Sequence, residues 1–197
     1  MGSRFREVEL SSLGHPLDIS RPSDVRTMMN RTWAGAEKMI LAGSSYGGNA
    51  ALEYAIAHHN RVAALVVCGT WAHGLTAVLE SLARIVTSDK IKPDVNRQVR
   101  VWSGTLHNSA GFRQALMEVM PLYTHDSTSS SQSPTPQLTL NYEAQNIVFS
   151  QSQPIYNVRS IRKMIAVPTL VAVGRQDAMV PFECSLNKYC TRKVPQT

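Results

Sequence analysis

The sequence predicts an α/β protein with a parallel sheet, because of its short apolar runs and the helix between two of them. The runs at 38–42, 62–68 and 169–173 have the length and composition of buried strands. Residues 47–59 place small and apolar side chains at helical spacing. A strand, a helix and a strand in this order form a βαβ unit, which implies parallel strands joined by a right-handed crossover.

Two further helices are expected near the ends of the sequence. Residues 22–33 predict a short helix, with Ser23 as its N-cap and apolar residues recurring at helical intervals. Residues 181–190 predict a last helix after the third strand.

The segment between the second and third strands differs in character. Residues 75–86 and 110–120 carry apolar side chains at helical intervals and predict two amphipathic helices. The polar stretch 124–137 cannot bury apolar surface and predicts a mobile loop. The strands therefore flank a helical insertion.

Composition and charge exclude several classes of protein. The 197 residues are 43% hydrophobic and 17% charged, which predicts one sizeable core rather than disorder, collagen or a coiled coil. The net charge is +6, but the basic residues are interspersed with acidic ones and do not cluster with aromatic residues. No nucleic-acid partner is therefore expected. No apolar run reaches the roughly 18–20 residues of a membrane span, and the first residues lack a signal-peptide core. We therefore expect a cytoplasmic protein with no membrane partner.

One motif carries chemistry: GSSYGG at 43–48, a G-x-S-x-G sequence between a predicted strand and a predicted helix. That context is typical of a nucleophile elbow, although a plain Gly/Ser turn is the alternative. Gly43 and Gly47, two residues to either side of Ser45, would let the strand and the helix approach without Cβ clashes. The serine hydroxyl is then lifted clear at the sheet edge, where the Tyr46 backbone N–H and the helix dipole can stabilise an oxyanion.

Two segments resemble a known family. Residues 38–69 resemble the nucleophile-elbow unit of the α/β-hydrolase superfamily, and residues 165–181 resemble the later strand and turn that deliver its acid. The insertion between them resembles the cap domain of proline-iminopeptidase-like hydrolases. The resemblance implies a partial α/β-hydrolase fold with Ser45 as nucleophile and Asp177 as the acid that orients a histidine. A solvated turn aspartate is the alternative for Asp177.

The histidine of the triad departs from the family order of serine, acid and histidine. It should follow Asp177, yet the last histidine of the sequence is His125. His73 follows the second strand at the elbow's edge of the sheet and has a possible approach, and His125 lies in the insertion. The His58–His59 pair lies about 18 Å along the helix from the elbow and is expected at the surface.

The front of the chain also departs from the family pattern. The second oxyanion donor normally comes from a loop after an early strand, and no clear His-Gly-type motif precedes the elbow. Residues 13–22 are either a faint likeness of that turn or an ordinary loop. The resemblance thus implies a family plan that is shortened at both ends.

The resemblance divides the chain into three parts. Residues 1–72 form the N-terminal part of the core with the nucleophile elbow. Residues 73–160 form the helical cap insertion with its mobile loop 124–137, and residues 161–197 form the C-terminal part of the core with the acid turn. Aromatic side chains that either line a pocket or pack in the core are Trp71, Trp102, Phe112, Tyr123, Tyr142, Phe149 and Tyr156.

The leading hypothesis is a serine hydrolase acting on an ester, amide or activated carbon–carbon bond through an acyl-enzyme at Ser45. Its substrate would be a small molecule or a short peptide. The alternative is a catalytically silent derivative that acts as a binding protein or has no function, because losing a triad member costs several orders of magnitude in rate. No cofactor or metal is expected, since no ligand cluster has metal spacing and GSSYGG lacks the end of a phosphate loop.

Overall fold

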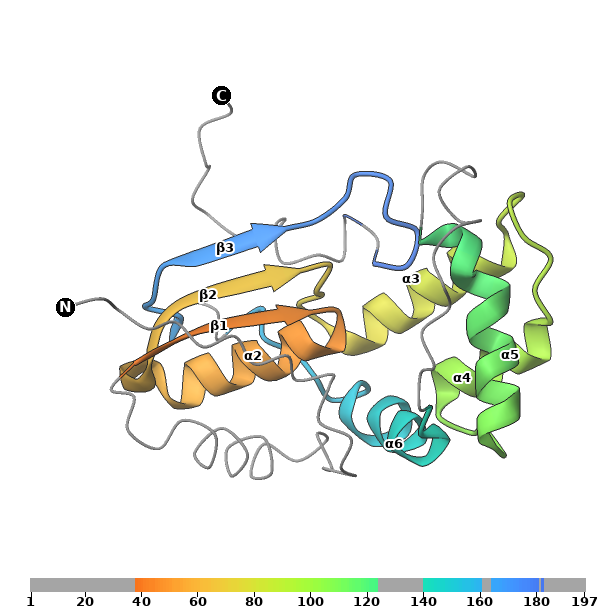
Figure 1. The fold of residues 1–197 in the computed structure, drawn as a ribbon, viewed down its shortest axis with the longest axis horizontal. Helices are drawn as coiled ribbons and strands as arrows, with labels where there is room; N and C mark the ends of the chain where they lie inside the picture. Colours follow the sequence, from red (N-terminus) through yellow and green to blue (C-terminus); the bar gives the residue numbers. More distant parts are fainter. Residues whose placement is uncertain (1–37, 124–139, 161–163, 181, 183–197) are drawn as a thin grey trace.

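A three-stranded parallel sheet forms the centre of the fold. The computed structural model describes residues 38–123, 140–160, 164–180 and 182. The strands, in the sheet order β1-β2-β3, are β1 (Met39–Ser44), β2 (Val62–Cys68) and β3 (Thr169–Ala172). Their arrows point the same way in Figure 1, and both pairings are parallel. The predicted α/β class and parallel sheet are thus confirmed. The elements predicted at 22–33 and 124–137, and all but residue 182 of 181–190, lie outside the described residues.

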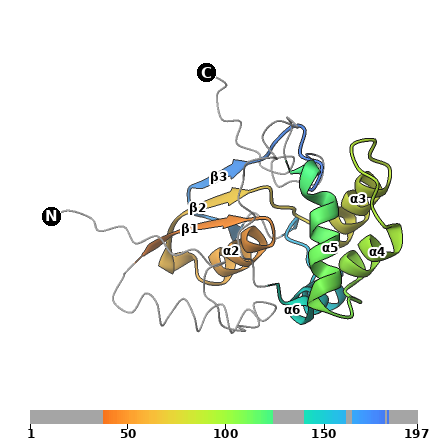
Figure 2. The same ribbon diagram turned by 45° about the vertical axis from the view of Figure 1, so that its right-hand side comes forward.

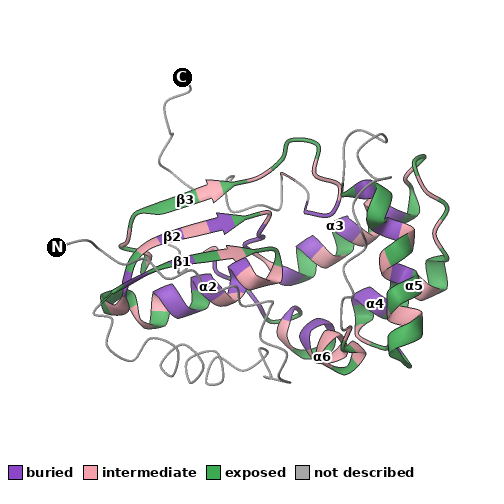
Figure 3. Ribbon diagram, viewed as in Figure 1, coloured by how far each residue is buried: buried purple, intermediate pink, exposed green. Residues whose placement is uncertain are grey.

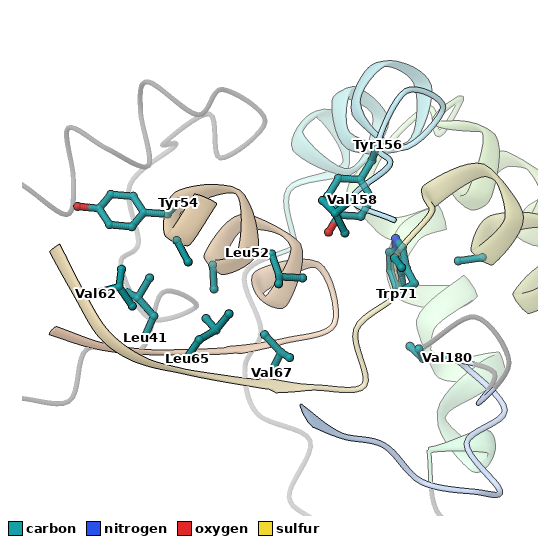
Figure 4. Close-up of a cluster of buried hydrophobic side chains, with 14 of the residues drawn as sticks. Leu41, Leu52, Tyr54, Val62, Leu65, Val67, Trp71, Tyr156, Val158 and Val180 are labelled. Atoms are coloured by element: carbon teal, nitrogen blue, oxygen red, sulfur yellow. The ribbon is translucent and has the colours of Figure 1, made fainter. Parts of the chain in front are cut away.

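Helix α2 (Tyr46–Ala57) connects β1 to β2 and covers one face of the sheet. Leu52 from the helix, Leu41 of β1 and Leu65 of β2 belong to one apolar cluster, and all three are at most 5% exposed (Figure 4). Burying one such side chain contributes about 1.5–3 kcal/mol. Small residues in the first turns of α2 let the helix lie close to the strands, which holds the β1–α2 turn in a fixed position.

The opposite face of the sheet is open in the described part of the chain (Figure 3). Ile40 of β1 is 48% exposed and Leu170 of β3 is 56% exposed, whereas Met39 and Leu41 of β1 are buried and Val171 of β3 is partly buried against the same apolar cluster. The prediction of buried strands at 38–42 and 169–173 is therefore wrong for this face. An apolar run reports strand propensity, but whether both faces are covered depends on elements elsewhere in the chain.

The segment between β2 and β3 is helical and gathers beyond the carboxyl ends of the strands (Figures 1 and 2). Its elements are α3 (Gly74–Val86), α4 (Val95–Ser103), α5 (Ser109–Val119), a 3₁₀ turn (Met120–Leu122), α6 (Tyr142–Ile147) and a π-helical turn (Val148–Ser152). The helices predicted at 75–86 and 110–120 are present within one residue at each end. These helices share a second apolar cluster, in which Ile85, Val101 and Val119 are buried.

Two buried hydrogen bonds join the helical segment to the rest of the fold. The Ser81 hydroxyl of α3 donates to the Met179 carbonyl, 2.7 Å away, in the turn after β3. The Trp71 indole N–H, just after β2, donates to the Gln153 side-chain oxygen at 2.6 Å. Met179 itself packs in the helical cluster. The helices are thereby held over the strand ends, and none of those described has the length and apolar character needed to cross a bilayer.

Candidate active site

Ser45 occupies a strained turn between β1 and α2. Its backbone has φ 52° and ψ −125°, and it is the one non-glycine residue with positive φ in the described ranges. Such a conformation costs about 1–3 kcal/mol and persists only where the surroundings enforce it. Here the Ser45 N–H donates to the Cys68 carbonyl at 2.9 Å, and the Gly48 N–H donates to the Ser45 carbonyl at 3.0 Å. The Ser45 side chain is exposed and makes no capping bond to α2.

Glycines on both sides of Ser45 permit this turn, but they are not the pair that the motif predicted. A Cβ on Gly43 would collide with the backbone of Gly47, and a Cβ on Gly48 would collide with the Thr70 side chain. A Cβ on Gly47 would meet nothing within 4 Å. The expectation that Gly47 avoids a Cβ clash is therefore wrong. Gly43 lies close to the Gly47 backbone, and Gly48 lies close to Thr70, so the residues that need to be glycine are Gly43 and Gly48.

Thr70, two residues after the end of β2, supports the elbow, and the sequence analysis did not identify it. Thr70 is 2% exposed, and its single hydroxyl hydrogen is shared between the Ser45 carbonyl, 3.2 Å away, and the Cys68 carbonyl, 3.1 Å away. The same side chain packs where Gly48 has no Cβ. A buried polar residue directly after an apolar strand was the available signal, since such a hydroxyl needs a partner.

Asp177 lies in the turn after β3 with its carboxylate held in place. One carboxylate oxygen, Oδ1, accepts hydrogen bonds from the N–H groups of Met179 at 2.9 Å and Val180 at 2.8 Å. The other oxygen, Oδ2, lies beside Gly69, where an added Cβ would be 3.5 Å away. Gly69 has φ 51°, a left-handed conformation that glycine adopts without strain. The turn thus fixes one oxygen and leaves the other facing the end of β2.

Ser45, Tyr46 and Asp177 line the same cavity of about 500 Å³. The cavity lies between the strand ends and the helical segment, and Trp102 and Phe149 belong to its lining. Its size is in the range of small-molecule sites. Tyr46 begins α2, so its backbone N–H belongs to the first turn of a 12-residue helix, where the helix dipole is positive. The structure therefore brings together the predicted nucleophile, oxyanion donor and acid at one edge of the sheet.

No histidine lines this cavity in the described part of the chain. His73, predicted to have an approach to the elbow, instead caps α3: its Nδ1 accepts from the Thr76 N–H at 3.2 Å. Burial and the charge of Arg159 lower the pKa of His73, which favours the neutral ring that this cap requires. The His58 ring packs on Tyr54 at the far end of α2.

The two other described histidines, His59 and His107, also lie outside the cavity lining. His59 lies in the turn after α2, and His107 lines a separate hollow at the start of α5. His125 lies outside the described residues. Across the described ranges, no three His, Cys, Asp or Glu side chains are grouped so that they could hold a metal ion.

Tyr123 lies at the rim of the cavity near the acid. Partial burial and the negative charge of Asp177 raise the pKa of the Tyr123 hydroxyl. The phenol therefore stays protonated at neutral pH and remains a hydrogen-bond donor in the cavity.

The fold and these site residues are those of one class of protein, which a comparison with known families identifies. A profile described as alpha/beta hydrolase fold matches residues 23–193. The chain belongs to the α/β-hydrolase fold family.

Individual relatives agree with this placement. The chain is 26% identical over 209 residues to a protein named proline iminopeptidase PfmaB from Pestalotiopsis fici, covering 98% of this chain and 72% of that protein. The fold of this chain is similar to that of an alpha/beta fold family hydrolase from Bacillus anthracis, with a TM-score of 0.62 at 20% identity over 85% of this chain. A hydrolase from Pseudomonas aeruginosa has a TM-score of 0.51 at 18% identity over 86% of this chain. The chain spans 60% and 58% of the lengths of these two solved proteins.

Proposed function

We propose that this protein is a serine hydrolase that forms an acyl-enzyme at Ser45. The observation that carries the proposal is the strained Ser45 backbone, φ 52° and ψ −125°, at the mouth of a cavity that Asp177 also lines. A strained serine without a capping role has no evident structural purpose, and strain of this kind is concentrated at functional sites. Membership of the α/β-hydrolase fold family supports the same role.

In the proposed reaction, the Ser45 oxygen attacks the carbonyl carbon of an ester, an amide or an activated carbon–carbon bond. The carbonyl oxygen becomes an oxyanion, and the Tyr46 N–H at the start of α2 donates to it. The bond to the leaving group then breaks, the serine proton passes to that group, and water releases the acyl group. The helices between β2 and β3 act as a cap that closes the cavity over a small molecule or a short peptide.

Proton transfer in this scheme needs a base, and Asp177 is the residue that would orient it. A second candidate follows from the histidine positions, because none of the described histidines lines the cavity. On that reading the chain is a silent member of the family that binds a ligand in the same cavity without turning it over. The two candidates share a site and differ in whether Ser45 reacts.

The test is labelling of the purified protein with a fluorophosphonate, followed by intact mass. The hydrolase predicts one label per chain, lost in Ser45→Ala. The neighbouring Ser44 also lines the cavity, so Ser44→Ala is the matched control and keeps the label. A folded protein that takes no label at any pH between about 6 and 9 is the silent member instead.

A further inference from the structure

The end of the cavity that the helical segment forms is mostly apolar. Its wall is formed by α4, α5 and the π-helical turn. The side chains that carry the argument are Val101, Trp102, Phe112, Leu116, Val119 and Phe149. Trp102 and Phe149 meet edge to face, with ring centroids 5.2 Å apart and planes at 84°. We call this end of the cavity the acyl chamber.

Three charged residues at α4 and α5 pair with one another outside the chamber. Arg97 of α4 forms a short ion pair with Glu118 of α5 and lies 3.4 Å from Asp94. None of these three lines the cavity. Both helices are thus joined by charges on their outer side, and their inner side keeps neutral groups only.

The amide nitrogen of Gln98, the polar side chain that α4 places in the lining, is already hydrogen-bonded within the protein. Gln98 is 1% exposed, and its amide nitrogen donates to the Ala115 carbonyl at 3.0 Å and to Glu118 at 2.9 Å. Both amide hydrogens are therefore used within the protein. Gln145 of α6 is the other amide in this wall, and it is also neutral.

We propose that the acyl chamber accepts an uncharged apolar acyl group, preferably one with an aromatic ring, and rejects acyl groups that carry a charge. Describing the bound group as an acyl group rests on the proposed function, because that function places the reacting carbonyl at Ser45. Among the described helical residues of the lining, no carboxylate faces a substrate ammonium and no cation faces a carboxylate; the Asp177 carboxylate lines the cavity from the turn after β3 and not from these helices. A charged group entering the chamber would lose its hydration without gaining a partner, which is strongly unfavourable.

The aromatic preference follows from the ring arrangement. The Trp102–Phe149 pair is edge to face, and the half-buried Phe112 ring lies in the same wall. A substrate ring can extend this arrangement at the 4.5–7 Å centroid spacing that aromatic pairs prefer. The chamber therefore does not favour a charged imino nitrogen, even though the relative from Pestalotiopsis fici is named a proline iminopeptidase.

Binding of simple amides to the Ser45→Ala variant, which cannot form an acyl-enzyme, tests the proposal without requiring catalysis. Phenylacetamide, hexanamide, adipamic acid and prolinamide are titrated into the full chain of this variant, and tryptophan fluorescence reports occupancy because Trp71 and Trp102 both line the cavity. Phenylacetamide and hexanamide are expected to bind at least about tenfold more tightly than the two charged amides. Equal or tighter binding of adipamic acid or prolinamide would overturn the proposal.

Substitutions on α5 locate the binding. Ala115 lines the chamber and is 2% exposed, so Ala115→Phe fills it and is expected to weaken phenylacetamide binding about tenfold or more. Met117 is 50% exposed on the same helix and does not line the cavity, so Met117→Phe is the matched control and leaves binding unchanged. If Ala115→Phe lowers the melting temperature, Phe112→Ala replaces it and is expected to remove the preference for phenylacetamide over hexanamide.

The results separate this proposal from the proposed function. If the uncharged amides bind more tightly but Ser45 is not labelled, the chamber proposal is retained and the protein binds its ligand without reacting. Labelling of Ser45 together with no selectivity among the amides, or with unchanged binding in folded Ala115→Phe, retains the hydrolase and refutes the chamber.

Discussion

Replacing Ser45 by glycine is expected to stabilise the protein while abolishing its reaction. The Ser45 side chain is exposed, so little packing is lost on substitution, and the effect comes from the backbone at φ 52° and ψ −125°. A side chain in such a conformation costs about 1–3 kcal/mol. Glycine removes that cost and loses about 0.5–1 kcal/mol in chain entropy, which leaves a net gain of about 1 kcal/mol.

The comparison that isolates this effect is Ser45→Gly against Ser45→Ala. Both variants lack the hydroxyl, but alanine keeps the Cβ and therefore the strain. Urea unfolding and thermal unfolding, each followed by circular dichroism, are expected to place the glycine variant about 1 kcal/mol above the alanine variant, or about 2–4 °C higher in melting temperature. A glycine variant as stable as the alanine variant, or less stable, would refute the argument that the elbow stores strain.

Three further predictions concern the support of the elbow and a nearby cap. Thr70→Val removes the hydroxyl that donates to the Ser45 carbonyl, and it is expected to lower the free energy of unfolding by about 1–3 kcal/mol and to slow Ser45 labelling. Thr70→Ser keeps the hydroxyl and is expected to keep both the stability and the labelling rate. Equal labelling of the two variants would contradict a positioning role. Gly48→Ala is expected to destabilise by about 1–3 kcal/mol, measured by urea unfolding, because its Cβ would enter the Thr70 side chain, and Gly47→Ala is the control with open space at its Cβ. Burial and the charge of Arg159 lower the pKa of His73 in the folded state. The contribution of His73 to stability is therefore present at high pH and is lost as the pH falls below the unfolded pKa of about 6.5. The melting temperature of the wild type is expected to fall more between pH 8 and pH 5 than that of His73→Asn. An equal loss in both proteins would show that another group is responsible.

The βαβ unit could be predicted because its signals are local. The strand at 62–68 has the predicted ends, and the helix predicted at 47–59 differs from α2 by one or two residues at each end. Ser45 and Asp177 could be selected for a similar reason, since each sits in a short motif beside an apolar strand. The structure adds that both line one cavity, which no local pattern contains.

Helix α4 could not be predicted from its apolar spacing. Its buried face includes the polar Gln98, while Val95 and Val99 are 51% and 42% exposed, so the apolar pattern does not match the buried side. The capping signals were more informative: Asp94 accepts from a first-turn N–H, and Gly104 ends the helix with φ 70°.

The roles of Thr70 and His73 depend on tertiary structure and could not be assigned from sequence. Thr70 acts on Ser45 across 25 positions of sequence. His73 lies at the predicted sheet edge, but its ring nitrogen is used by the first turn of α3 rather than by the elbow. A residue's place at the end of a strand therefore does not fix the direction of its side chain.

Trapping of the acyl-enzyme tests the central claim most directly. The protein is mixed with p-nitrophenyl acetate, quenched in acid, and digested for peptide mapping by mass spectrometry. The account predicts one acetyl group per chain, located on Ser45 and not on the adjacent Ser44, and none in Ser45→Ala. Acetylation spread over surface lysines with none on Ser45, in a protein that remains folded, would contradict it.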